Sequence, residues 1–118
     1  MTSRRLEVVL TDIIETIDRI LAATAGKTFD EFEADWLVSF ATQRAIEIIS
    51  EATRHIPDEK LNNFPDIPWK RVRGIGNILR HEYHKTADDV IWAVVTQNLP
   101  PLRAAVAGIL REMGEEPK

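Results

Sequence analysis

The stretch "LEVVLTDIIETIDRIL", residues 6–21, decides the fold class of this chain. Its apolar residues return every three or four positions, which is the spacing of one face of an α-helix and not the alternation of a β-strand. These residues are Leu6, Val9, Leu10, Ile13, Ile14, Ile17, Ile20 and Leu21. The pattern predicts an amphipathic helix over residues 4–24, ended by Gly26.

The next segment carries a helix start signal. Thr28 and Glu31 fit the S/T-x-x-E capping box, so we expect a helix to begin at "FDEFEADW". A long helix follows and ends at Pro57. Its apolar residues form one stripe, consisting of Leu37, Phe40, Ala41, Ala45, Ile48, Ile49 and Ala52.

The second half of the chain continues the helical pattern. The proline-rich stretch 57–68 predicts a loop, after which a helix covers residues 69–84. Thr86 and Asp89 suggest another capped start, and "NLPPL" predicts a bend before a last helix over residues 101–113. We therefore predict an all-α, up-and-down bundle of about five helices, with residues 1–118 forming one domain.

Composition narrows the possible functions. The chain has 15 Lys and Arg against 19 Asp and Glu, a formal charge of −4, which argues against broad duplex binding. It has no cysteine, which excludes disulfides, thiolate catalysis and zinc sites that need sulfur. The N-terminus mixes apolar and acidic residues, unlike a signal peptide, and no apolar run is long enough for a membrane helix. We expect a cytoplasmic protein with no membrane partner.

The predicted helix 69–84 has two distinct faces. Its apolar stripe comprises Trp69, Val72, Ile75, Leu79 and Tyr83, so we expect Tyr83 to be a core aromatic. Its polar stripe comprises Arg73, Asn77, Arg80, His81 and His84. A guanidinium, an amide and an imidazole on one face suit phosphodiester chemistry. Solvation alone also explains such a stripe, and both interpretations stay open at this point.

Positive charge gathers around this helix, although the chain as a whole is acidic. Arg80, His84 and Lys85 are the candidate substrate-binding residues of this cluster. The three histidines show no H-E-x-x-H signature, so we predict no metal site and no cofactor.

Several segments resemble the HepT-like ribonuclease toxins of the HEPN superfamily, the partners of minimal nucleotidyltransferase antitoxins. The similar segments are "VVLTDIIETIDRI", "TFDEFEAD", "QRAIEIISEATRHIP" with Arg44 and Glu51-Ala52, "IPWKRVRGIGNILRHEYHK" and "DDVIWAVVTQNLPPLRAAV". The resemblance implies an all-helical homodimer that cleaves RNA without a metal. The family motif is an arginine, a gap of four to six residues and then His-x-Tyr.

The resemblance also assigns roles to single residues. His81 matches the motif histidine, the general acid or base around attack by the RNA 2′-hydroxyl. Tyr83 matches the tyrosine to which the antitoxin of some members attaches AMP, and Asn77 matches the polar residue after the motif arginine. Gly76 stands where that arginine is expected, which leaves Arg73 or Arg80 to stabilise the transition state.

Three hypotheses follow from this departure. The first is an endoribonuclease toxin that uses His81, Asn77 and either Arg73 or Arg80. The second is a catalytically degenerate HEPN module that binds RNA or a nucleotide, or docks a nucleotidyltransferase antitoxin. The third is a helical homodimer that serves assembly alone. An RNA-cleavage assay separates the first hypothesis from the others.

Overall fold

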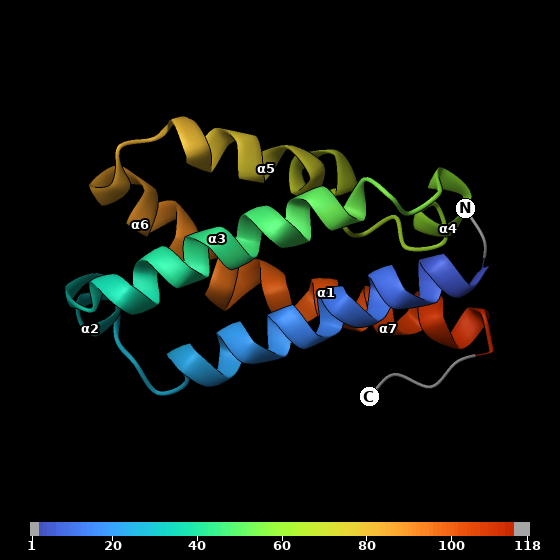
Figure 1. Ribbon diagram of the computed structural model, residues 1–118, viewed down its shortest axis with the longest axis horizontal. Coiled ribbons are helices and arrows are strands. Elements are labelled where there is room, and N and C mark those ends of the chain that lie inside the picture. The colour runs from blue at the N-terminus through green and yellow to red at the C-terminus, as the bar shows by residue number, and fades with distance from the viewer. Residues whose placement is uncertain (1–2, 115–118) are drawn as a thin grey trace.

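Helix α1 (Ser3–Thr24) packs against both α3 (Trp36–Thr53) and α7 (Leu99–Glu112) (Figure 1). The computed structural model of the chain describes residues 3–114, and at residue 3 and residues 84–86 it describes the backbone alone. The predicted apolar face of α1 is buried, with each of its main residues at most 5% exposed: Leu6, Leu10, Ile13, Ile14, Ile17 and Ile20. The first helix prediction is confirmed. None of the described helices is both long and apolar enough to span a membrane.

An ion pair between Asp18 and Arg103 joins α1 to α7. The Arg103 guanidinium donates Nε to Asp18 Oδ1 at 2.6 Å and Nη2 to Asp18 Oδ2 at 3.0 Å. These hydrogen bonds lower the pKa of the Asp18 carboxyl and raise the pKa of Arg103. The pair links the two helices at the edge of their buried apolar contact.

The predicted capping box is confirmed, but the helix that it starts is short. Glu31 N–H donates to Thr28 Oγ1 at 3.2 Å, and Thr28 N–H donates to Glu31 Oε1 at 2.9 Å, which lowers the pKa of the Glu31 carboxyl. Helix α2 (Phe29–Ala34) ends at Asp35, whose carboxylate then caps α3 by accepting from Val38 N–H. Phe32 is fully buried, with its ring centroid 5.0 Å from that of Trp92.

Helix α3 buries hydroxyl side chains and exposes large apolar ones. Leu37, Phe40 and Ile48 of its predicted apolar stripe are 63%, 51% and 44% exposed, whereas Ile49 is buried. The buried polar residues of this helix are Ser39, Thr42, Ser50 and Thr53. Hydrogen bonds to carbonyls compensate such burial, as between Thr53 Oγ1 and the Ser50 carbonyl at 2.7 Å. The apolar stripe therefore lies largely on the outer side of α3.

The stretch 57–68 is not entirely a loop, because it contains the one-turn helix α4 (Asp58–Leu61), which buries Leu61. Helix α5 (Trp69–His81) then begins directly after Pro68, as predicted. Trp69 Nε1 donates to the Phe64 carbonyl at 2.9 Å, which ties the start of α5 to the preceding loop.

Helix α5 ends at His81, three residues earlier than predicted. Glu82 is extended (φ −88°, ψ 146°), and helix α6 (His84–Ala93) begins after Tyr83. The interruption turns the chain so that Ala87 and Ile91 of α6 enter the core. It also turns Tyr83 outward, where it is 65% exposed, so the prediction of a core tyrosine is wrong. The capped start predicted at Thr86 is also wrong, because α6 begins at His84; the Thr86 side chain lies outside the described residues.

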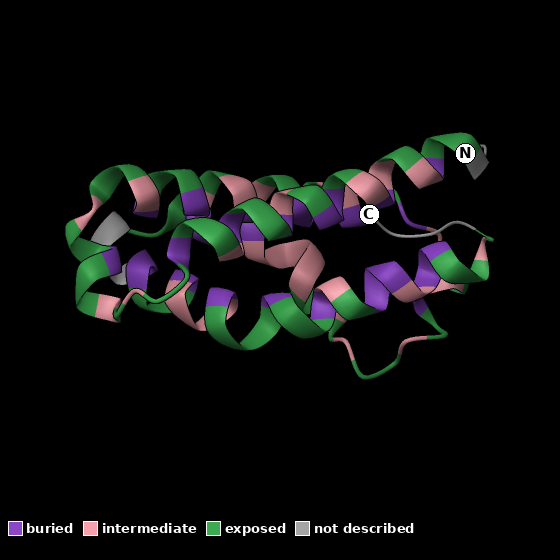
Figure 2. Cartoon of the chain, turned by 90° about the horizontal axis from the view of Figure 1, so that it is seen from below, coloured by how far each residue is buried: buried purple, intermediate pink, exposed green. Residues whose placement is uncertain are grey.

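Helix α6 continues through a π-helical segment (Val94–Asn98) into α7. The predicted bend at "NLPPL" takes this form, with the two prolines in the first turn of α7. A widened turn before a proline accommodates the missing N–H donor without breaking the helix. The described residues contain helices and no strand, which confirms the all-α bundle. Figure 2 shows that its buried residues lie on the inward sides of these helices.

Candidate active site

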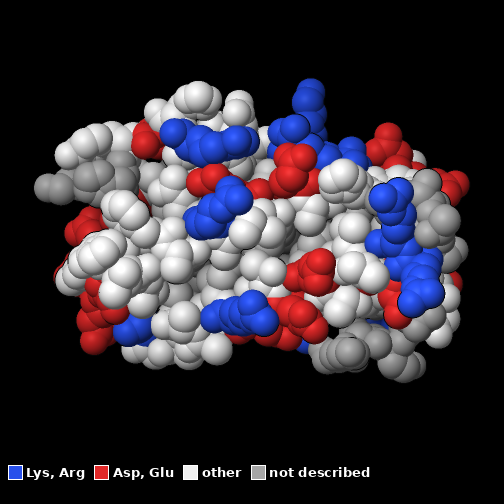
Figure 3. All heavy atoms as spheres, viewed as in Figure 1, with Lys and Arg blue, Asp and Glu red and all other residues white. Residues whose placement is uncertain are grey.

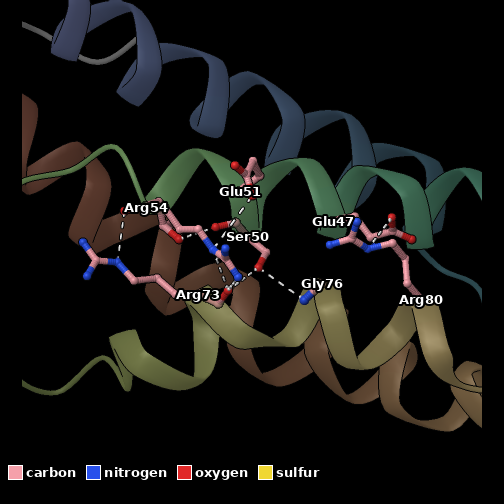
Figure 4. A network of polar contacts seen from close by, with 8 residues as sticks. Glu47, Ser50, Glu51, Arg54, Arg73, Gly76 and Arg80 are labelled. Carbon is pink, nitrogen blue, oxygen red and sulfur yellow. Dashed lines mark hydrogen bonds and ion pairs between the residues drawn. The ribbon is translucent and has the colours of Figure 1, made fainter.

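Helices α3 and α5 are in close contact at Gly76, which is buried between them (Figure 4). Gly76 N–H donates to Ser50 Oγ at 3.2 Å, and Ser50 Oγ donates to the Arg73 carbonyl at 3.0 Å. A Cβ atom at position 76 would lie 3.1 Å from Ser50 Cβ and 3.2 Å from Glu47 Cα. The second distance is to backbone, so a side chain here would push the helices apart. Glycine at this position therefore permits the close contact of α3 with α5.

Arg73 lies in the first half of α5, where its side chain reaches the end of α3 (Figure 4). Its guanidinium donates Nε to the Thr53 carbonyl at 3.2 Å and Nη2 to the Ile56 carbonyl at 2.7 Å. Nη1 forms an ion pair with Asp58 at 3.0 Å. These contacts fix the end of α3 and the start of α4 against α5. All three guanidinium nitrogens of Arg73 are therefore held by these contacts.

Arg80 contacts α3 through a carboxylate that it shares with Arg44. Glu47 Oε1 lies 3.7 Å from Arg80 Nε and 3.5 Å from Arg44 Nη1. The Glu47 side chain is 11% exposed, while Arg80 and Arg44 are 57% and 71% exposed. The carboxylate is thus nearly buried beneath two solvent-facing arginines.

This charged group lines a surface hollow between α3 and α5 with a volume of about 370 Å³. Its lining residues are Arg44, Glu47, Ile48, Glu51, Ala52, His55 and Arg80. Figure 3 shows basic side chains along the edge of the molecule formed by α5, with acidic side chains interspersed. Further Lys and Arg side chains lie at the right-hand end and the lower edge of the same view, so positive charge is not confined to α5.

The other predicted site residues lie around the end of α5. Asn77 and His81 are exposed on this helix, and Tyr83 is exposed in the short connection to α6. The His-x-Tyr motif therefore spans a helix end rather than one continuous helix. His84 and Lys85 belong to the first turn of α6, and their side chains lie outside the described residues.

Comparison with known protein families identifies one family that matches most of the chain. The family model described as "Ribonuclease HepT-like" matches residues 13–109. The chain belongs to the HepT-like ribonuclease family. The resemblance inferred from the sequence motifs is thereby confirmed.

Two relatives show how far the sequence similarity of this HepT-like chain to other proteins extends. "Putative RNase MJ1380" of Methanocaldococcus jannaschii is 32% identical over 106 residues, covering 90% of the chain and 97% of the relative. "Probable ribonuclease HepT" of Thermococcus cleftensis is 35% identical over 94 residues, covering 80% and 86%. No solved structure gives a significant match.

Polar residues of α3 lie beside Arg80 although the sequence patterns predict no role for them. Arg44 belongs to a segment of the family resemblance, Glu47 lies in neither predicted stripe, and Gln43 donates Nε2 to Glu47 Oε2 at 3.3 Å. A signal was present, since Gln43, Arg44 and Glu47 are polar residues at helical spacing beside an apolar stripe. Among the described residues, no group of three or more His, Asp or Glu side chains is arranged to hold a metal ion.

Proposed function

We propose that this HepT-like chain is a metal-independent endoribonuclease that acts as the toxin of a toxin–antitoxin pair. The observation that carries the proposal is that Arg80 and His81, consecutive residues in the last turn of α5, both have exposed side chains. Imidazole exchanges protons near neutral pH, and a guanidinium stabilises charge on phosphate oxygens. An intact His-x-Tyr motif in a chain of a ribonuclease family supports the same function.

The proposed reaction uses the RNA itself as nucleophile. His81 accepts the proton of a 2′-hydroxyl, whose oxygen attacks the adjacent phosphorus. A bond from phosphorus to the 2′-oxygen forms, and the bond from phosphorus to the 5′-oxygen breaks. Arg80 stabilises the negative charge on the phosphate oxygens, with Asn77 orienting them. The leaving 5′-oxygen takes a proton from water, and His81 afterwards releases its own proton to the solvent. The other product ends in a 2′,3′-cyclic phosphate.

Incubating the purified protein with single-stranded RNA in EDTA tests this function. We expect cleavage without added metal and 2′,3′-cyclic phosphate ends, which end-group analysis detects. An RNA of the same sequence with 2′-deoxy sugars is the control and should stay intact, since it lacks the nucleophile. Intact RNA in the first reaction would contradict the enzyme proposal.

Gly76 at the position of the motif arginine favours one alternative function. In this alternative, the chain is a catalytically degenerate HEPN module that binds RNA or a nucleotide, or docks a nucleotidyltransferase antitoxin. Intact RNA in the cleavage assay, together with RNA binding or a stable complex with the antitoxin, would establish this alternative.

The proposed antitoxin is a minimal nucleotidyltransferase that modifies Tyr83. At 65% exposure and outside any helix, the Tyr83 ring is accessible to another enzyme. The phenolic oxygen would attack the α-phosphorus of ATP and release pyrophosphate. We expect mass spectrometry to show one added AMP group after incubation with such an enzyme and Mg-ATP. Tyr83→Phe should gain no mass, and modification elsewhere would contradict the assignment.

The proposed homodimer forms through the exposed apolar side of α3. Trp36, Leu37 and Phe40 are each more than half exposed, and a hollow of about 530 Å³ lies beside them between α1 and α3. Exposed apolar surface of this kind is typical of protein interfaces. Arg44 and Ile48 line both this hollow and the Arg80 hollow, so a second copy seated here would border the proposed active site.

We expect Leu37→Glu to dissociate the dimer, since it would place a carboxylate in an apolar interface at high cost. Sedimentation velocity would measure the change in mass. Val8→Glu is the matched control, because Val8 is 55% exposed on α1 and lines neither hollow. A wild-type protein that sediments as a monomer would contradict the dimer.

A further inference from the structure

The Glu47 carboxylate is a nearly buried acidic group that the proposed reaction does not use. Its two ion pairs, at 3.5 Å to Arg44 and 3.7 Å to Arg80, meet at the same oxygen, Oε1. Gln43 Nε2 donates to the other oxygen, Oε2, at 3.3 Å and also contacts the Leu79 carbonyl at 3.3 Å. A carboxylate 11% exposed loses hydration, which such partners must replace. The contacts hold it at a fixed place beneath Arg80.

Gly76 explains how Glu47 comes so close to α5. A Cβ atom at residue 76 would lie 3.2 Å from Glu47 Cα, which is tighter than usual, so a larger residue would need the two backbones to shift slightly apart. The contact brings the Glu47 side chain within reach of Arg80, which lies one turn further along α5. The residue that replaces the motif arginine thus also allows an acidic side chain of α3 to hold a different arginine.

We propose that Glu47 is a positioning residue. It holds the Arg80 guanidinium through its Nε atom and keeps it in place to bind a substrate phosphate over the hollow between α3 and α5. This inference rests on the proposed ribonuclease function. The ion pair with Glu47 is formed by Nε, and the Arg80 side chain is 57% exposed, so the guanidinium stays open to a ligand. A guanidinium held on one edge loses less conformational freedom when it binds a phosphate.

The hollow combines charges of both signs. Arg44 and Arg80 contribute two positive charges to its lining, and Glu47 and Glu51 contribute two negative charges. Glu51 also forms an ion pair at 3.8 Å with Arg54, which lies outside the lining, and His55 is the remaining titratable group of the hollow.

A double-mutant cycle on RNA cleavage tests the proposal. We expect Arg80→Ala to lower kcat by about 10²-fold, and Glu47→Gln to lower it by about 10-fold, since the amide keeps the shape but loses the charge. The double variant should be no slower than Arg80→Ala, because Glu47 acts through Arg80. Glu47→Gln should leave KM unchanged or lower it, since it removes a negative charge near the RNA. Multiplied losses in the double variant would overturn the proposal.

Asp18→Asn is the matched control, because it also converts an arginine-bound carboxylate into an amide, but between α1 and α7. It should leave kcat unchanged. If Asp18→Asn lowers kcat as much as Glu47→Gln does, the effect is one of stability and the positioning role is wrong.

An NMR measurement separates failure of this proposal from failure of the ribonuclease function. The ¹H–¹⁵N signal of Arg80 Nε, assigned by its loss in Arg80→Ala, should move in Glu47→Gln and stay in place in Asp18→Asn. An unmoved signal would overturn the positioning role even if the wild-type protein cleaves RNA. A moved signal with intact RNA would leave the contact established and reject the ribonuclease function instead.

Discussion

Replacing His81 with alanine is expected to abolish RNA cleavage, with a rate loss of about 10²–10⁴-fold. His81 carries the one imidazole of the His-x-Tyr motif, and it is exposed in the last turn of α5 beside Arg80. Without it, no group of the motif removes the proton of the 2′-hydroxyl near neutral pH. Single-turnover cleavage of a labelled RNA in EDTA measures the loss directly.

The His81→Ala result is interpretable because the residue is exposed. Replacing an exposed side chain usually changes the free energy of unfolding by no more than about 0.5 kcal/mol. The urea midpoint of the variant should therefore match that of the wild type, and the variant should still bind 2′-deoxy substrate. Retained cleavage by a folded His81→Ala protein would place the general base elsewhere.

Local signals in the sequence predicted most of the fold. The i, i+3, i+4 recurrence of α1, the Thr28 capping box and the helix start after Pro68 all depend on neighbouring residues, and each is confirmed. The end of α5 depends on tertiary packing instead. Continuing the helix would place Tyr83 above Leu79 on the core side, but the turn at Glu82 sends Ala87 and Ile91 inward in its place.

The two faces of α3 also show that local sequence patterns do not determine which residues are buried. An apolar stripe usually marks the buried side of a helix, yet Leu37 and Phe40 are exposed while Ser50 and Thr53 are buried. Carbonyl oxygens satisfy those hydroxyl groups, so their burial costs little. The core side of α3 thus mixes Ile46 and Ile49 with hydroxyl residues whose hydrogen bonds are satisfied, and hydrophobic periodicity does not record that compatibility.

The candidate site was predictable in part. Matching to a family motif identified His81 and Tyr83, but spacing along one helix left Arg73 and Arg80 as equal candidates for the catalytic guanidinium. The distinction comes from α3 and the loop after it, whose carbonyls and Asp58 engage Arg73. It also comes from Glu47, which engages Arg80. Contacts between helices carry this information, and a single helical pattern does not contain it.

Restoring the motif arginine by Gly76→Arg is expected to destabilise the protein by about 3 kcal/mol or more, and not to create or increase cleavage. The new side chain would collide with Ser50 Cβ and with the backbone at Glu47 Cα, each within 3.2 Å of the added Cβ. It would also part the helices that bring Glu47 to Arg80. Urea unfolding gives the free energy, and the EDTA assay gives the activity.

Gly74 provides the matched control, because it lies in the same helix and a Cβ atom there would meet nothing within 4 Å. Gly74→Ala should stabilise the protein by about 0.5–1 kcal/mol, since alanine favours the helix over glycine. Gly76→Ala receives the same propensity gain but compresses the contact with α3, so it should be about 1–3 kcal/mol less stable than Gly74→Ala. Equal stability of the two alanine variants would show that α3 and α5 separate easily at this point. In that case Gly76 has no packing role, and Gly76→Arg tests whether restoring the motif arginine increases RNA cleavage.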